Sequence, residues 1–399
     1  MKKPSGWKQA LTFSLAGFFA TAVTYGPARM GFGLFLPEFR GEFALSTGTA
    51  GFIASAAFLG FLLALPVAAG LTARRGPRAP ILVGGLLAFS GMALVAASLN
   101  GVMLAAGIAV AGSSPGFCWT PYNNAAPKMA AADLRHHVLS AISTGTTIGV
   151  TAAGGLAALI AFSNHSWRLA WGAFAACGIL MTIFNFFVLR NDADRLRARA
   201  ADTATGPSEA GFKGLFEPKA IPLFALALSF GATSAIYLSF AADRVTAAGG
   251  LTGLPPRASS PAIFIAYGLI GLVGLIAGRL EERMGLVRLL RGIFLCSALS
   301  LALVARMPNS LPGVLLSAGL QGGCVMTISA IFAFWSLRIF PHLPATGFTG
   351  AILALAAGSI VGPGVAGLTL DHFGAEATFL GAGLLSLLTA VGVRSTIIR

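Results

Sequence analysis

Long, uninterrupted apolar runs recur along the whole of this sequence and restrict what it can fold into. A helix that crosses a bilayer needs roughly 20 apolar residues. Hydrophobic residues make up 56% of the 399 residues and charged residues only 10%, whereas soluble domains carry roughly 25% charged residues. Because the apolar runs are continuous and do not alternate with polar residues, they predict membrane-spanning helices rather than a β-barrel. An ordinary water-soluble enzyme is excluded.

Read on this scale, the sequence predicts an all-α membrane protein with twelve transmembrane helices. The predicted spans are residues 10–36, 48–71, 80–97, 102–122, 138–162, 169–189, 221–242, 261–280, 289–305, 313–337, 345–370 and 377–393. A polar stretch, residues 190–219, is predicted to be a cytoplasmic linker. It separates an N-terminal bundle of six helices (1–189) from a C-terminal bundle of six (220–399).

The basic residues test this map independently. With the N-terminus in the cytoplasm, 21 of the 27 Lys and Arg residues fall on cytoplasmic segments or helix ends, 5 fall on the outer side, and Arg29 lies within a span. Cytoplasmic loops of membrane proteins carry an excess of Lys and Arg. We therefore expect a multi-pass protein of the cell (inner) membrane with both termini in the cytoplasm. The same rule accounts for the net charge of +14, so the lipid bilayer is an expected partner and nucleic acid is not.

The two halves carry similar features in the same order. Residues 71–76 match residues 280–285 at an offset of 209, and Gly112, Gly116 and Thr120 recur as Gly319, Gly323 and Thr327 at an offset of 207. Gly26 and Glu38 recur as Gly231 and Asp243 at an offset of 205. Two parallel repeats of six helices are a known plan for transporters.

One loop carries a specific motif. Residues 278–285 read GRLEERMG, which is similar to the loop signature G-x-L-x-D-R-x-G of the major facilitator superfamily, with Glu282 in the Asp position. The earlier copy of this loop retains Arg74, Gly76 and Arg78 but has Ala73 in place of the acid. The segment GPARMGFGLFLPEF, which contains Arg29, is similar to the first helix of the YbfB/YjiJ-like bacterial subfamily.

This resemblance implies two pseudo-symmetric six-helix bundles around one central site, and transport by alternating access. It also implies that the signature loops form charge contacts between helices. The residues concerned are Arg74, Gly76, Arg78, Gly278, Glu282, Arg283 and Gly285. The chain departs from the family pattern in its fourth helix, where Ile108 replaces the signature Arg, and in its fifth, where Gly145 and Gly149 are followed by Val150.

Arg29 is the only charged residue well inside a predicted span. It lies about 9 Å outward from the middle of the first span at 1.5 Å per residue. A charge at that depth costs several kcal/mol unless it faces a cavity or a partner, and a guanidinium matches the planar fork of a carboxylate or phosphate. Arg29 therefore predicts an anion contact. The alternatives are snorkelling toward the outer surface or a structural pair with a group on another helix.

The resemblance places the first, fourth, seventh and tenth helices around the central cavity. The candidate substrate-binding residues on them are Arg29, Tyr25, Thr24, Phe32, Ser114, Trp119, Tyr237, Ser234, Gln321 and Thr327. For a single Ser or Thr, packing between helices is the favoured interpretation. Glu38 and Asp243 stand at the outer ends of the first and seventh helices, and we expect them to cap a helix or to act in gating.

No motif indicates catalysis. The sequence contains no G-x-x-x-x-G-K-[ST] loop, no H-E-x-x-H motif and no Cys/His cluster, so no enzyme activity, catalytic residue, cofactor or metal is predicted. Because no Asp or Glu occupies the centre of a span, we expect facilitated diffusion or coupling through the charge of the substrate.

The function predicted from these features is secondary-active or facilitative transport of a small molecule by a monomer. A small organic anion, a carboxylate, is favoured because of Arg29. Efflux of amphiphilic, drug-like compounds is an alternative, which the aromatic lining favours. A non-transporting membrane sensor is an alternative of another class, and the degenerate first loop is compatible with it.

Overall fold

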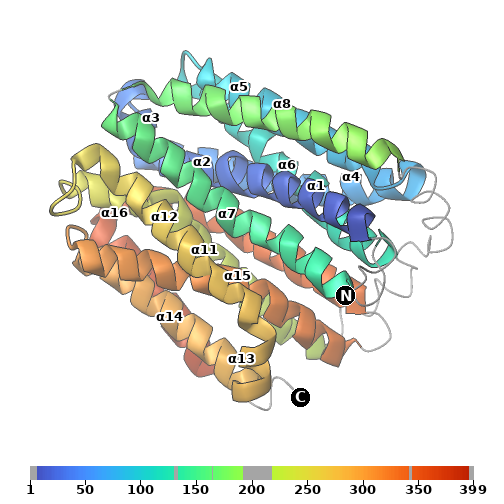
Figure 1. Cartoon of the computed structure of the whole chain (residues 1–399). Coiled ribbons are helices and arrows are strands. Elements are labelled where there is room, and N and C mark those ends of the chain that lie inside the picture. Colours follow the sequence, from blue (N-terminus) through green and yellow to red (C-terminus); the bar gives the residue numbers. More distant parts are fainter. Residues whose placement is uncertain (1–6, 130–133, 164, 192–217, 341–343, 395–399) are drawn as a thin grey trace. The chain divides into compact units, whose positions relative to one another are not determined.

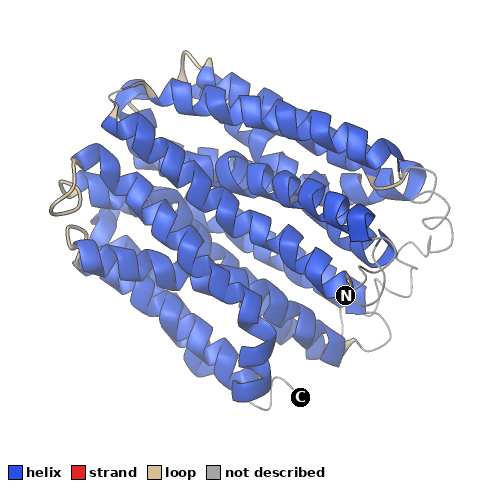
Figure 2. Ribbon diagram, in the orientation of Figure 1, coloured by secondary structure: helices blue, strands red, loops and turns tan. Residues whose placement is uncertain are grey.

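The computed structural model describes residues 7–129, 134–163, 165–191, 218–340 and 344–394. Every regular element in these ranges is a helix (Figure 2), as predicted. Most of the predicted linker, residues 192–217, lies outside the described residues.

Contacts divide the chain into two compact units that do not follow the halves of the sequence. Unit 1 consists of Met1–Phe32 and Leu59–Gly206, and unit 2 of Gly33–Phe58 and Pro207–Arg399. Residues 33–58, which belong to the first half of the sequence, therefore pack with the second half. The predicted boundaries of the two bundles stay a prediction.

Figure 1 labels the α-helices of the first half of the chain, where the described residues form nine elements. They are α1 (Trp7–Tyr25), the π-helix η1 (Gly26–Met30), α2 (Gly31–Leu34), α3 (Leu36–Phe43), α4 (Thr47–Arg75), α5 (Arg78–Ala96), α6 (Gly101–Met129), α7 (Arg135–Phe162) and α8 (Trp167–Asn191). The second half contributes η2 (Pro218–Ala220), α11 (Ile221–Ala247), η3 (Pro256–Ala258), α12 (Ser259–Gly271), η4 (Leu272–Ile276), α13 (Ala277–Met284), α14 (Leu286–Arg306), α15 (Leu311–Ile339) and α16 (Pro344–Gly392).

Ten of the described helices are long and apolar enough to cross a membrane. The longest, Gly347–Gly392, contains the non-helical residue Gly374, which separates the last two predicted spans. The first predicted span, which is not among the ten, is made of α1, η1 and α2. All twelve predicted spans therefore coincide with helices, and the chain is a multi-pass membrane protein. Many large apolar side chains are exposed on these helices, such as Leu159 and Val391, which is the surface that lipid requires.

Glycines allow the same close helix packing in both units. In unit 1, a Cβ on Gly145 would lie 2.4 Å from Phe18 O, and one on Gly149 would lie 2.1 Å from Ala22 O. In unit 2, a Cβ on Gly358 would lie 2.0 Å from Leu228 O, and one on Gly362 would lie 2.4 Å from Ala232 O. Small residues let two helix backbones approach this closely. The pair α1–α7 is therefore repeated by the pair α11–α16.

This packing corrects the register expected between the first and seventh helices. Phe18 corresponds to Leu228 and Ala22 to Ala232, which is an offset of 210 and not the 205 that Gly26 and Gly231 suggested. Thr21 donates to Ile142 O, and Gly231 approaches Leu355 O in the same way. Thr21 and Gly231 are again 210 residues apart. The sequence pattern failed because small residues recur every few positions in both helices.

Each of the two signature loops contains a glycine with the same positive φ. Gly76 and Gly285 both have φ of 75°, and their N–H groups donate over 2.8 Å to Thr72 O and Glu281 O respectively. A glycine in the left-handed region commonly ends a helix in this way. The offset of 209 between the two loops is confirmed.

Candidate functional site

The first helix changes from α to π geometry at Gly26–Met30, the segment that contains Arg29. Pro27 has no N–H to donate, so it cannot take part in a regular hydrogen-bond ladder. Short π segments inside α-helices are frequent at functional sites. The local sequence thus places the one charged residue of the first predicted span where the backbone is least regular.

Aromatic rings surround the Arg29 guanidinium. Its central carbon lies 4.2 Å from the centre of the Phe61 ring on α4 and 5.4 Å from that of Tyr25. The Tyr25 ring lies 6.3 Å from that of Trp119 on α6, tilted by 60°. These four residues, the Arg29 cluster, all belong to unit 1. Phe61 is buried, whereas Arg29, Tyr25 and Trp119 are partly exposed.

The ring faces stabilise the cation. The electron-rich face of an aromatic ring attracts a guanidinium, by about 2 kcal/mol or more where water is excluded. The cluster can therefore keep a positive charge at membrane depth beside surfaces that suit an apolar group. The sequence predicted Arg29, Tyr25 and Trp119 but not Phe61, because nothing distinguishes this residue from the other phenylalanines.

The other candidates in unit 1 are buried. The Thr24 hydroxyl donates to Ala20 O over 2.7 Å, and the Ser114 hydroxyl donates to Ala111 O over 2.7 Å. Both side chains are fully buried, and Phe32 is buried as well. Since each hydroxyl is satisfied by a carbonyl of its own helix, helix packing accounts for Thr24 and Ser114.

Two of the candidates in unit 2, Tyr237 and Gln321, contact buried serines of α14 and α15. Tyr237 Oη accepts from Ser317 Oγ over 3.3 Å, and Gln321 Oε1 accepts from Ser297 Oγ over 3.4 Å. Ser300 and Ser317 bond each other across α14 and α15. Ser234 donates to Gly231 O over 3.3 Å, and Thr327 is buried on α15.

The signature loop of unit 2 contains an ion pair, but not at the expected acid. Glu281 binds Arg338 on α15, whereas Glu282, in the Asp position of the signature, is exposed. Adjacent helix positions differ by about 100° in direction, so Glu281 faces α15 and its neighbour does not. Gly278 lies within α13, and Arg283 is exposed.

In the other loop, the Arg78 guanidinium lies 4.7 Å from the centre of the Phe186 ring. Arg74 is exposed in the last turn of α4.

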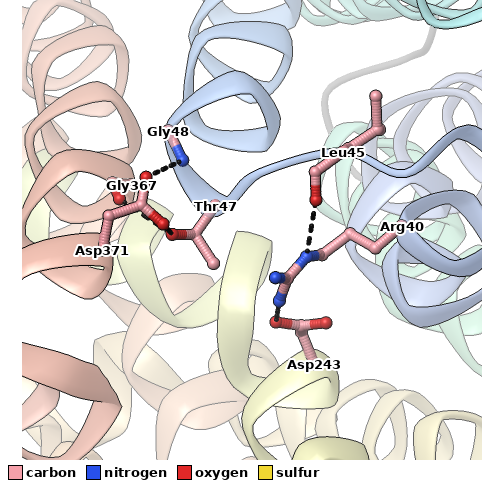
Figure 3. Close-up of polar contacts among 7 residues, drawn as sticks. All are labelled: Arg40, Leu45, Thr47, Gly48, Asp243, Gly367 and Asp371. Atoms are coloured by element: carbon pink, nitrogen blue, oxygen red, sulfur yellow. Dashed lines mark hydrogen bonds and ion pairs between the residues drawn. The ribbon is translucent and has the colours of Figure 1, made fainter.

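Polar contacts tie residues 33–58 to the rest of unit 2 (Figure 3). Arg40 Nη1 binds Asp243 Oδ2 over 2.5 Å, and Arg40 Nε donates to Leu45 O over 3.2 Å. Asp371 accepts from the Thr47 hydroxyl and from Gly48 N–H, the latter over 3.0 Å. Asp243 thus makes a contact at the expected outer end, while Arg40 and Asp371 belonged to no sequence motif.

Glu38 lies nearby on α3, largely buried. Burial raises the pKa of its carboxyl above the ordinary value, and its own backbone N–H and the charge of Arg257 oppose this rise. Oε2 accepts no hydrogen bond from the residues that the structure describes. Elsewhere in the described ranges, no three His, Cys, Asp or Glu side chains gather in a way that could hold a metal ion.

Comparisons with known proteins agree with this architecture. A family model described as Major Facilitator Superfamily matches residues 14–276. A chloramphenicol resistance protein of Streptomyces lividans is 27% identical over 348 residues, which cover 84% of each chain.

Several solved transporters share the fold. The nucleoside transporter NupG has a TM-score of 0.74 at 12% identity, covering 96% of this chain and 98% of its own. A POT family transporter in complex with 5-aminolevulinic acid has a TM-score of 0.75 at 12% identity, covering 97% and 95%. A bacterial homologue of the human lysosomal transporter Spinster has a TM-score of 0.69 at 15% identity, covering 98% and 95%. At such identities the likeness concerns the fold alone.

Proposed function

Because the chain belongs to the major facilitator superfamily, we propose that it carries a small organic anion, a carboxylate, across the membrane by alternating access. Membrane transport is the function of the family and of its structural neighbours. The observation that carries the choice of substrate is the Arg29 cluster, in which the guanidinium of a partly exposed arginine lies over Phe61 and Tyr25.

The chemistry of the cluster favours an amphipathic carboxylate. A guanidinium binds a carboxylate through two parallel N–H···O bonds, and the rings of Tyr25 and Trp119 offer apolar surface beside it. A cation in a span costs several kcal/mol, so an anion that shares the site lowers the cost of both charges. Transport is facilitative, or is driven by the charge of the substrate, since no carboxyl occupies the centre of a predicted span.

A second candidate is efflux of amphiphilic, drug-like compounds. The name of the Streptomyces lividans relative supports it, and so do the rings of the cluster, because stacking on an aromatic face needs no charge on the substrate. A non-transporting sensor is a third candidate, supported by the loss of the acid from the first signature loop.

We place the chain in the YbfB/YjiJ-like subfamily because of the segment around Arg29, and in the inner membrane with both termini in the cytoplasm because of its basic loops. It works as a monomer with lipid and a small-molecule substrate as its partners, and with no nucleic acid.

Uptake into proteoliposomes tests the choice of substrate. Purified protein is assayed with radiolabelled monocarboxylates, dicarboxylates and aromatic carboxylates, and with neutral amphiphiles. We expect saturable flux of a carboxylate, with KM raised more than about 10-fold by Arg29→Ala, as loss of a hydrogen bond to a charged group predicts. Arg306→Ala, at an exposed arginine paired with Glu376, is the control. Unchanged kinetics in Arg29→Ala, or flux of neutral amphiphiles alone, would overturn the anion proposal.

A further inference from the structure

Residues Gly33–Phe58, here called the strap, pack with unit 2 although the chain before and after them belongs to unit 1. The strap contains α3 and the first turns of α4. It begins three residues after Met30, the last residue of the π-helix that holds Arg29. The strap therefore follows closely after the Arg29 segment in the chain.

Backbone lies directly on backbone where the strap meets α11 and α16. A Cβ on Gly33 would lie 1.9 Å from Leu238 O, and one on Gly51 would lie 2.3 Å from Pro363 O. The Ser55 hydroxyl donates to Ile360 O over 2.6 Å. At these three points, only small groups lie between the strap and the backbones of α11 and α16.

Asp371 supplies a cap for the start of α4 from a distant part of the sequence. The first N–H groups of a helix have no partner within the helix, and a side chain close in sequence usually binds them. Here Ser46 Oγ accepts from Thr49 N–H over 3.1 Å, while Asp371 Oδ2 accepts from Gly48 N–H over 3.0 Å (Figure 3). Thr47 Oγ1 contacts both Asp371 and Gly367 O. The cap is therefore complete only while the strap lies on α16.

The charge of Asp371 fits α4 better than its own helix. It lies three residues before Gly374, where α16 loses its helical conformation, and a negative charge is unfavourable near a helix C-terminus. At the N-terminus of α4 the same charge is favourable. Arg40 and Asp243 make a second polar tie between the strap and α11, at the end that the basic loops assign to the outer side.

We propose that Asp371 is a latch, a positioning residue that keeps the strap on α11 and α16, and that each transport cycle breaks and reforms its contact with Thr47 and Gly48. This inference rests on the alternating-access part of the proposed function. Because only Gly31 and Phe32 separate the π-helix from the strap, release of the latch also moves the Arg29 segment. The strap thereby links the candidate anion site to the opening of the outer side.

Hydrogen exchange measured by mass spectrometry on the full chain in nanodiscs tests the latch without any substrate. With Asp371→Asn we expect amides of residues 47–58 to exchange at least ~10-fold faster, as loss of a hydrogen bond to a charged group predicts. Glu376→Gln, which removes another acid of α16 with an ion partner, is the matched control and should leave residues 47–58 unchanged. Asp371→Glu should restore most of the protection.

The outcomes separate the latch from general stability and from the choice of substrate. Unchanged exchange in residues 47–58 overturns the latch, and so does faster exchange spread equally over α5 and α8. If Asp371→Asn does not fold, Thr47→Val removes the hydroxyl contact and should accelerate the same amides to a smaller extent. No change there overturns the proposal. Failure of carboxylate uptake leaves this measurement intact, because exchange is recorded without substrate.

Discussion

The guanidinium carbon of Arg29 lies 4.2 Å from the centre of the Phe61 ring, so a residue of α4 stabilises the positive charge on the π-helix. Phe61→Leu keeps an apolar side chain there but removes the ring face. We expect a loss of about 1–2 kcal/mol, between the values for exposed and for desolvated cation–π contacts. Thermal unfolding in one detergent measures it. The control is the same change in an Arg29→Met background, where a loss of equal size would show that the charge is not involved.

The close approach of α7 to α1 predicts opposite results for two glycines of one helix. A Cβ on Gly149 would lie 2.1 Å from Ala22 O, whereas a Cβ on Gly155 would meet nothing within 4 Å. Gly149→Ala should therefore cost about 1–3 kcal/mol through overpacking. Gly155→Ala should stabilise the helix by roughly 0.5–1 kcal/mol. Equal shifts in Tm for the two variants would contradict the packing described for α1 and α7.

Ala44 ends α3 in the left-handed conformation, with φ of 48° and ψ of 43°. A side chain with a Cβ pays roughly 1–2 kcal/mol there, and glycine does not. Ala44→Gly should raise the free energy of unfolding by about 1 kcal/mol after its greater chain entropy is subtracted. Chemical denaturation measures the change. A destabilised Ala44→Gly variant would mean that this turn has another conformation in the membrane.

Glu38 predicts a pH dependence of stability. Its folded pKa is raised by burial, so its contribution to stability is fully present below the ordinary Glu value of about 4.3. The contribution is lost as pH rises through the raised folded pKa. The Tm of the wild type should therefore fall relative to Glu38→Gln between about pH 4 and the raised pKa, since glutamine does not titrate.

Glu42→Gln, at an exposed acid on the same helix, is the matched control for this series. Scanning calorimetry from acid to neutral pH compares the three proteins. A constant difference in Tm between the wild type and Glu38→Gln at every pH would contradict the assignment.

Properties that belong to a whole helix or to a local motif could be predicted from the sequence. The spans follow from the length of the apolar runs, and the match of the two signature loops follows from a motif that ends in Gly76 and Gly285 at the same φ. Contacts that depend on a single residue of another helix could not be predicted from the sequence. Asp371 meets Gly48 across 323 residues, and Glu281 rather than Glu282 reaches Arg338 because of a rotation of one residue on α13.

Part of the candidate site could be predicted from the sequence, and part of it could not. A lone charge inside an apolar run marks Arg29 whatever surrounds it, and Tyr25 lies one turn away on the same helix. Phe61 comes from another helix, and its choice among 30 phenylalanines depends on how α4 is rotated. The hydropathy of the sequence does not indicate how α4 is rotated about its axis, because this helix is apolar on every face.

The π-helix at Gly26–Met30 also makes the length of this segment as important as its composition. A π turn contains about one residue more than an α turn, and each residue of an α-helix advances the direction of the side chains by about 100°. Deleting one residue between Gly26 and Met30 would let the helix return to α geometry while the side chains of α1 and α2 keep their directions, because the π turn holds its extra residue within one turn. Only the side chains of that turn would change direction, so the guanidinium of Arg29 would no longer lie over Phe61. A single deletion could thus change what the protein binds without substituting any residue of the site.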